Sequence, residues 1–215
     1  MIKYSPNELA FQEYYKGGDK KAFLEKVIKI SNNMFIDPNW LMAVMYSESG
    51  LNPRAQNWKY LVNGEPATGL IQFVKKTAES LGTTTSKLFA MSGVDQLDYV
   101  ETYFVRTGKL SRVKSFHDLY LITFYPAAVG KSLDWQFPKS VLKDNPSLDM
   151  NKNGVLTISD FKEYTQSRVR NYLKNKPKKI VDAFYGQRDR TGEVLLTAIA
   201  LLICFGLILT LASFL

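Results

Sequence analysis

Apolar residues recur at helical spacing along most of this chain. The recurrence at steps of three and four residues predicts helices, because these positions share one helix face. The predicted helices cover residues 20–35, 38–49, 69–81, 88–91, 97–107, 115–125, 161–176 and 180–185. Residues 51–68 carry Pro, Gly and Asn and predict a loop or a short hairpin around residues 62–65. No long segment alternates apolar with polar residues, so the predicted fold class is mainly α.

One acid falls on an apolar stripe. In the predicted helix over residues 38–49 the stripe consists of Leu41, Val44 and Met45, and its next position is Glu48. A carboxylate on the buried face of a helix is costly when charged, so its pKa should rise. A carboxylic acid that stays protonated near neutral pH can serve as a general acid. Glu48 is therefore the first candidate for a catalytic residue.

The C-terminal residues have a different composition. Residues 194–215 contain no charged side chain. As a helix they would extend about 33 Å, enough for the roughly 30 Å hydrocarbon core of a bilayer. A buried core helix is the alternative, but such a helix rarely lacks a polar face over this length. We expect a transmembrane anchor at residues 193–215, preceded by a basic juxtamembrane segment at residues 176–192.

Charge and cysteine content narrow the class further. The net charge is +8, which suits an anionic partner such as a cell-wall glycan, a nucleic acid or lipid head groups. No helix-turn-helix pattern or aromatic-basic repeat is present, so we expect no nucleic-acid partner. The single cysteine, Cys204, excludes an internal disulfide. Residues 1–8 lack an apolar run, so no cleavable secretion signal is expected there.

Three motifs follow one another along the chain. They are Glu-Ser-Gly-Leu-Asn-Pro at residues 48–53, Thr-Gly-Leu-Ile-Gln-Phe at residues 68–73 and Phe-Tyr-Pro-Ala-Ala-Val-Gly at residues 124–130. Together they resemble the catalytic motifs of the lytic transglycosylase family, whose core is that of goose-type lysozyme. The resemblance covers roughly residues 20–140, and phage-borne members are the most similar. The third motif departs from the family pattern, because Pro126 stands where the family has Asn.

The resemblance implies roles for four residues. Glu48 would protonate the glycosidic oxygen between N-acetylmuramic acid and N-acetylglucosamine, and would then act as base toward the muramoyl C6 hydroxyl to give a 1,6-anhydro end. Ser49 would bond near the acid or the substrate, or act only as a hydroxyl at a helix C-terminus. Gln72 would contact the glycan through its amide, and the hydroxyl of Tyr125 would hold the catalytic carboxyl. No cofactor is implied for catalysis.

A second motif lies downstream, at residues 149–160. Oxygen-bearing side chains at positions 1, 3, 5, 9 and 12 and a glycine at position 6 have the spacing of an EF-hand calcium loop. The expected ligands are Asp149, Asn151, Asn153, Val155 through its carbonyl, and Asp160. A proline interrupts the entry helix, and position 12 is Asp rather than the usual Glu, so a metal-free turn held by Asx side chains is the alternative. A bound calcium ion would be structural.

The expected organisation is a lysozyme-like transglycosylase domain with an EF-hand-like loop and a C-terminal transmembrane helix. Its segments are residues 1–19 (N-terminal extension), 20–145 (transglycosylase domain), 146–175 (calcium-loop segment), 176–192 (basic segment) and 193–215 (anchor). The expected function is a membrane-anchored peptidoglycan lytic transglycosylase. Alternatives are a lysozyme-type hydrolase and a non-catalytic virion structural or wall-binding protein. The location follows as a phage virion membrane, with capsid or spike proteins as partners, or a bacterial cytoplasmic membrane.

Overall fold

The structure, a computed structural model, describes residues 4–62 and 64–185 of the chain. Helices account for most of the secondary structure, as predicted, with a single hairpin between α2 and α3. The elements are η1 (Pro6–Glu8), η2 (Gln12–Tyr14), α1 (Lys20–Asn33), α2 (Pro38–Ser49), β1 (Gln56–Val62), β2 (Glu65–Thr68), α3 (Lys75–Ser80), α4 (Thr85–Ala90), α5 (Gly93–Arg106), η3 (Leu110–Arg112), α6 (Phe116–Phe124), η4 (Pro126–Ala128), α7 (Lys139–Asp144), η5 (Pro146–Leu148), α8 (Ile158–Leu173) and α9 (Lys178–Tyr185).

Local signals set the ends of α2, the helix that carries the candidate acid. The Asp37 side chain accepts the backbone N–H of Asn39 at 2.8 Å, and Pro38 occupies the first helical position. Gly50 ends the helix in the left-handed region, with φ +62°, where a side chain would be strained. The position of Glu48 in the last turn of α2 therefore follows from signals at the two ends of the helix itself.

The helix predicted over residues 69–81 begins later in the structure. The prediction placed a helix over residues 69–81, but residues 69–72 form a turn and α3 begins only at Lys75. Gly69 and Gln72 both have positive φ, at +84° and +54°, and Thr68 pairs with Phe73 as an isolated bridge. The turn extends the hairpin, whose antiparallel strands were predicted correctly as the alternative to a loop.

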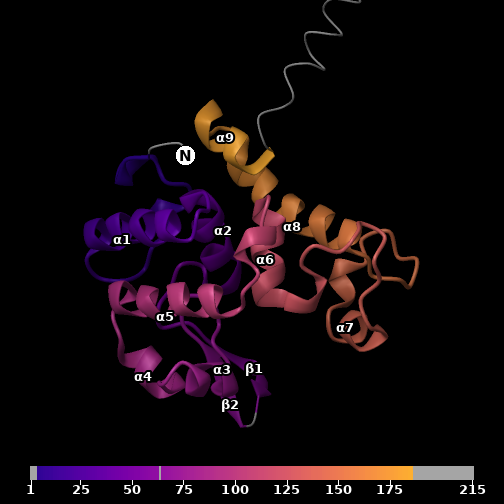
Figure 1. The fold of residues 1–215 in the computed structure, drawn as a ribbon, viewed down its shortest axis with the longest axis horizontal. Coiled ribbons are helices and arrows are strands. Elements are labelled where there is room, and N and C mark those ends of the chain that lie inside the picture. Colours follow the sequence, from indigo (N-terminus) through magenta and orange to yellow (C-terminus); the bar gives the residue numbers. More distant parts are fainter. Residues whose placement is uncertain (1–3, 63, 186–215) are drawn as a thin grey trace, which may run out of the picture.

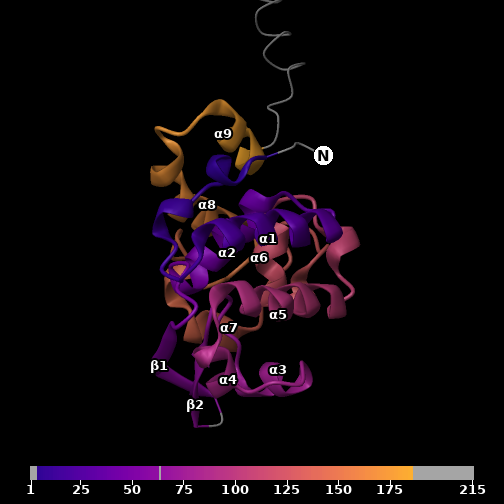
Figure 2. The same ribbon diagram turned by 90° about the vertical axis from the view of Figure 1, so that its left-hand side faces the viewer.

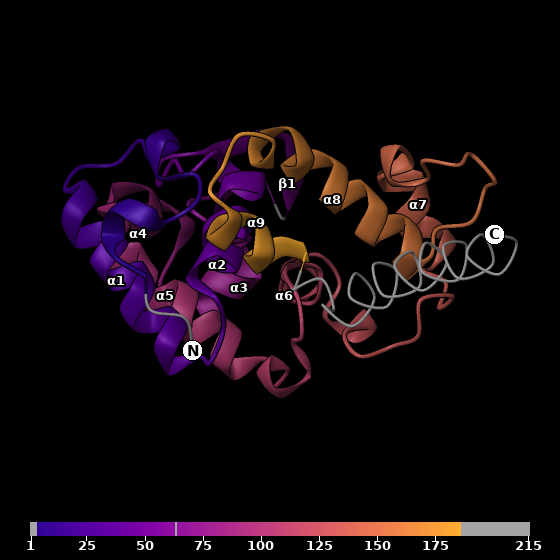
Figure 3. The same ribbon diagram turned by 90° about the horizontal axis from the view of Figure 1, so that it is seen from above.

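The elements stack in layers along one direction of the molecule. Figures 1 and 2 show α1 and α2 on one side of α5, and α3, α4 and the hairpin on its other side. Helix α6 packs on α2, and α8 packs on α6. Along the long axis α1 and α7 lie at opposite ends (Figures 1 and 3). Across that axis, α9 lies at the top of Figures 1 and 2 and the hairpin at the bottom. The last turn of α2 therefore lies near the middle, between the hairpin side and the α6–α8 side.

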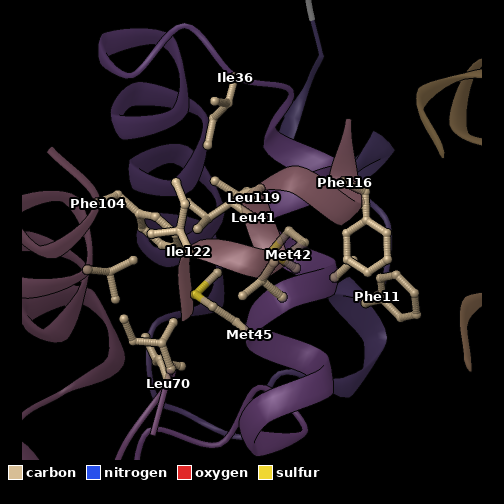
Figure 4. Close-up of a cluster of buried hydrophobic side chains, with 14 of the residues drawn as sticks. Phe11, Ile36, Leu41, Met42, Met45, Leu70, Phe104, Phe116, Leu119 and Ile122 are labelled. Carbon is tan, nitrogen blue, oxygen red and sulfur yellow. The ribbon is translucent and has the colours of Figure 1, made fainter. Parts of the chain in front are cut away.

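One hydrophobic core joins all of these parts, including the N-terminal residues. Phe11 is fully buried, and its ring stacks on Tyr172 at 3.8 Å and on Tyr46 at 4.6 Å between centroids. Figure 4 shows Phe11 together with core residues of α2, α5 and α6. The predicted extension at residues 1–19 thus contributes to the same core as α2 and α8, in so far as residues 4–19 are described.

The predicted anchor at residues 193–215 lies outside the described residues. Within residues 4–62 and 64–185, no helix is both long enough and apolar enough to cross a bilayer. The basic segment before the anchor is described in part, and it contains α9, which packs on α2. The Trp40 indole of α2 donates to the Ala183 carbonyl of α9 at 2.5 Å.

Candidate active site

The carboxyl of Glu48 lies in a desolvated setting on the last turn of α2. The residues before it, from Leu41 to Met45, are fully buried, whereas Glu48 itself keeps partial exposure. Burial raises the pKa of Glu48 from 4.5 to about 7, against the opposing effects of a Tyr120 hydrogen bond and the Arg168 charge. A substantial fraction of the carboxyl is therefore protonated at neutral pH and within reach of a ligand, as a general acid requires.

Three other helices bring groups to this carboxyl. Tyr120 of α6 donates its hydroxyl to Glu48, and its own pKa is raised well above the usual value, mainly by burial. Tyr103 of α5 lies close enough for the Glu48 charge to raise its pKa further, after burial, to about 12, and its hydroxyl donates to the Ile122 carbonyl at 2.9 Å. Arg168 of α8 adds the one full positive charge that acts on Glu48 among the described residues.

Ser49 ties α2 to the turn that follows the hairpin. Its Oγ lies 2.9 Å from the Met45 carbonyl and 3.0 Å from the Leu70 carbonyl, so its proton is shared between the two. The hydroxyl thus bonds to a carbonyl of the last turns of α2, and the role of Ser49 near the acid or the substrate stays a prediction. Its contact with Leu70 fixes residues 69–72 against the end of α2.

Gln72 holds the same turn closed. Its Nε2 donates to the carbonyls of Gly69 and Ala55, at 3.0 and 3.3 Å. A second amide supports the turn from α5, because Gln96 Oε1 accepts the Leu70 N–H at 3.0 Å. Hydrogen bonds from Ser49, Gln72 and Gln96 thus hold this turn against the end of α2, which carries Glu48. The sequence did not single out Gln96 as a site residue, because the predicted helix began at residue 97, whereas α5 begins at Gly93.

The tyrosine that bonds to Glu48 is not the one that the sequence predicted. Tyr125, expected to hold the carboxyl, ends α6, and its ring packs near Trp135 at 6.1 Å and Phe137 at 5.5 Å. The role expected for Tyr125 stays a prediction, whereas the tyrosine that lowers the pKa of Glu48 is Tyr120, more than a turn earlier. The proline at position 126 disfavours helical geometry in the residue before it, and Tyr125 has φ −155° and ψ 84° at the end of α6.

The loop at residues 149–160 folds as a series of Asx turns. Asp149 Oδ2 accepts the Gly154 N–H at 2.9 Å, and Asn151 Oδ1 accepts the Asn153 N–H at 3.0 Å. Gly154 has φ +79°, the sharp turn expected at the sixth position. Asn151 Nδ2 donates to Asp160 Oδ1 at 2.8 Å, so the third and twelfth positions are joined directly.

The two ends of this loop differ. At the exit, Asp160 Oδ2 accepts the N–H of Thr157 at 2.9 Å in a capping box that starts α8. At the entry, η5 replaces the helix that an EF-hand would have. Val155, predicted to offer its carbonyl, donates its N–H to Asn153 Oδ1 at 2.9 Å. Within the described residues no group of three or more His, Cys, Asp or Glu side chains is placed to hold a metal ion.

Comparison with known proteins supports the reading of the first two motifs, at residues 48–53 and 68–73, whereas the third lies outside the matched residues. No curated protein matches the chain. The family model described as "Transglycosylase SLT domain" matches residues 25–102, which include α2 with Glu48, the hairpin and the turn closed by Gln72. Residues 25–102 are therefore a transglycosylase SLT domain of the lysozyme-like superfamily, and this domain indicates a lytic transglycosylase, a lyase that acts on peptidoglycan.

Proposed function

We propose that Glu48 is the single general acid and base of this domain. We also propose that it cleaves the β-1,4 bond between N-acetylmuramic acid and N-acetylglucosamine. The supporting observation is the setting of its carboxyl, whose pKa burial raises to about 7 while the side chain stays partly exposed. Most glycosidases place two carboxylates across the bond. Among the described residues no second carboxylate contributes to the shifted pKa of Glu48, which favours a mechanism with one acid.

The chemistry balances without water. Glu48 gives its proton to the glycosidic oxygen, the bond from C1 to that oxygen breaks, and the N-acetylglucosamine side leaves as an alcohol. The acetamido oxygen of the muramoyl residue closes on C1 and carries the positive charge. The Glu48 carboxylate then takes the proton of the C6 hydroxyl, and the C6 oxygen displaces the acetamido oxygen at C1. The product has a 1,6-anhydro ring, and Glu48 is protonated again.

Substitution of Glu48 tests the assignment. Glu48→Gln keeps the shape of the side chain and removes the proton, so peptidoglycan cleavage should fall by at least about 10²-fold, the usual scale for a lost general acid. Glu79→Gln is the matched control, because Glu79 is exposed on α3. Cleavage by Glu48→Gln at the rate of the control would refute the assignment.

We further propose that residues 193–215 anchor the domain in a membrane and that the protein is carried in a phage virion to open the wall at entry. The support is the uncharged composition of residues 194–215. Flotation of the full chain with lipid vesicles, compared with a chain ending at residue 185, tests the anchor. Purified virions that lack the protein would contradict the virion role.

We propose a structural calcium ion for the loop at residues 149–160. The side chains of this loop fit a calcium ion in part, because Asp149 and Asp160 supply two carboxylates. A bound ion would have to displace the hydrogen bond from Asn151 to Asp160, which joins two of the ligand positions. Calcium at millimolar concentration should raise the melting temperature of the wild type more than that of Asp149→Asn. An equal response of both proteins would favour the metal-free turn.

A further inference from the structure

Phe35, in the turn between α1 and α2, is the most exposed large apolar residue in the described part of the chain. It is 85% exposed, although Met34 and Ile36 on either side of it are buried. The two buried neighbours hold the turn on the core, so the phenylalanine ring is left in water. A single exposed apolar residue is common on protein surfaces, and exposure alone therefore indicates no partner.

The backbone of Phe35 adds a second observation. The residue has φ +57°, in the left-handed region, which is strained for a bulky side chain. The turn is a Schellman motif that ends α1, in which the N–H of Phe35 donates to the Asn32 carbonyl at 3.1 Å. The N–H of Ile36 donates to the Ser31 carbonyl at 3.0 Å. Glycine is the usual residue at this position of the motif, and asparagine the next. A strained phenylalanine whose ring lies in water indicates a role outside the fold.

The turn that carries Phe35 lies beside the start of α9. Two residues after Phe35, the Asp37 carboxylate accepts the Tyr4 hydroxyl at 3.0 Å. The Lys179 ammonium, in the first turn of α9, lies 4.6 Å from the centre of the Tyr4 ring. Figures 1 and 2 show α9 at the end of the molecule opposite the hairpin. Phe35, Tyr4 and α9 therefore lie together, and we call them the α9 end of the domain.

The sequence tethers this end closely to the proposed anchor. Helix α9 ends at Tyr185, which is exposed, and the uncharged residues begin at position 194. The intervening residues, 186–193, can span at most roughly 30 Å even when fully extended. If residues 193–215 cross a membrane, the α9 end is thus held close to the bilayer surface, and closer than the hairpin at the opposite end.

The charge around the start of α9 favours the same surface. Residues 174–179 contain four lysines and no acid. The side chain of Lys178 is 78% exposed, and its ion pair with Asp182 lies on the surface, where such pairs are weak. Lysines next to a membrane anchor are attracted to anionic head groups. An exposed aromatic ring and a lysine-rich segment therefore lie at the end of the domain that the tether keeps near lipid.

We propose that the α9 end docks on the bilayer surface and that the ring of Phe35 enters the layer between head groups and acyl chains. The proposal rests on the proposed membrane anchor at residues 193–215. Aromatic side chains gather at this depth in membrane proteins, because their apolar rings leave water there. From Asp37 to Glu48, α2 extends roughly 16 Å. Its last turn contacts residues 69–72, which continue the hairpin, so docking leaves the candidate acid away from the lipid.

Fluorescence quenching by lipid measures the depth of position 35 in the full chain. Phe35→Trp and the control Leu61→Trp, at an exposed position of the hairpin, are reconstituted in vesicles of phosphatidylcholine and phosphatidylglycerol, with or without bromine on the acyl chains. The wild type gives the background of its own tryptophans. The added tryptophan at position 35 should lie roughly 5–10 Å into the boundary of the acyl chains and lose most of its fluorescence to bromine. The added tryptophan at position 61 should keep its fluorescence.

Phe35→Asn separates docking from folding. Asparagine tolerates the left-handed backbone, so the melting temperature of this variant in detergent should equal or exceed that of the wild type. On vesicles, slow hydrogen exchange at residues 34–37 should be seen in the wild type and lost in Phe35→Asn. A lower melting temperature of Phe35→Asn, equal exchange in both proteins, or quenching at position 35 no stronger than at position 61 overturns the docking while leaving the anchor intact. A full chain that does not float with vesicles refutes the anchor, and the docking with it.

Discussion

Replacing Glu48 by Gln should make the folded protein more stable, and increasingly so as the pH rises. The wild-type carboxyl must ionise in a place from which burial excludes water, whereas a glutamine of the same shape never ionises there. A residue kept for function at the cost of stability behaves in this way. The prediction is independent of substrate, so it tests the setting of the acid apart from the chemistry.

The magnitude follows from the two pKa values. In the unfolded chain the carboxyl loses its proton near 4.5, and in the folded protein near 7. Between these values the folded state binds more protons than the unfolded state, so the stability of the wild type falls as the pH rises, and the loss is complete above about pH 7. A shift of this size corresponds to about 3 kcal/mol. The advantage of Glu48→Gln should therefore be small at pH 4 and reach up to about 3 kcal/mol at pH 8.

Urea unfolding of both proteins at several pH values between 4 and 8 measures this difference. Burial lowers the pKa of His117 to about 4, and its titration also changes stability with pH, but equally in both proteins, so it cancels. Glu79→Gln, at an exposed position, should differ from the wild type by an amount independent of pH. A stability difference between Glu48→Gln and the wild type that is the same at pH 4 and pH 8 would refute the reasoning.

Three further substitutions test the surroundings of the site. Tyr120→Phe should lower kcat about 10-fold or more and move the alkaline limb of its pH profile upward, whereas Tyr125→Phe should change the limb little; the opposite pattern would restore the role expected for Tyr125. Gln96→Leu should cost at least about 2 kcal/mol in urea unfolding, because three buried backbone groups lose their partner; a neutral result would contradict the hydrogen bonds seen. Phe11→Ala should cost about 3–5 kcal/mol in the same assay, and a loss below 1 kcal/mol would separate residues 4–19 from the core.

The helices were largely predictable, because their ends are encoded locally. Asp37 and Pro38 begin α2 and Gly50 ends it. Between them, the apolar residues recur at helical spacing. The turn at residues 69–72 was not predictable in this way. Leu70 and Ile71 continue an apolar pattern, and hydrogen bonds from Gln96 and Ser49, distant in sequence, help to hold these residues out of a helix. Tertiary partners decide the conformation there.

Some of the residues of the candidate site could likewise be predicted from the sequence, and others could not. Glu48 was visible because a carboxylate in an apolar register conflicts with its neighbours, and such conflicts mark functional positions. The effects of Tyr120 and Arg168 on Glu48 could not be predicted from the sequence. A tyrosine among apolar residues and an exposed arginine on a helix are ordinary whether or not they lie near a functional site. Their role arises only when α6 and α8 pack against each other next to α2. The resemblance pointed to Tyr125, whereas the tyrosine that lowers the pKa of Glu48 in the structure is Tyr120.

The most direct test of the account is the chemistry of the product. Peptidoglycan is digested with the wild type in water labelled with heavy oxygen, and the muropeptides are analysed by mass spectrometry, with Glu48→Gln as the inactive control. The account predicts ends that are lighter than reducing ends by one water and carry no label, because the C6 oxygen of the muramoyl residue replaces water. Reducing ends that carry the heavy oxygen would show a hydrolase and contradict it.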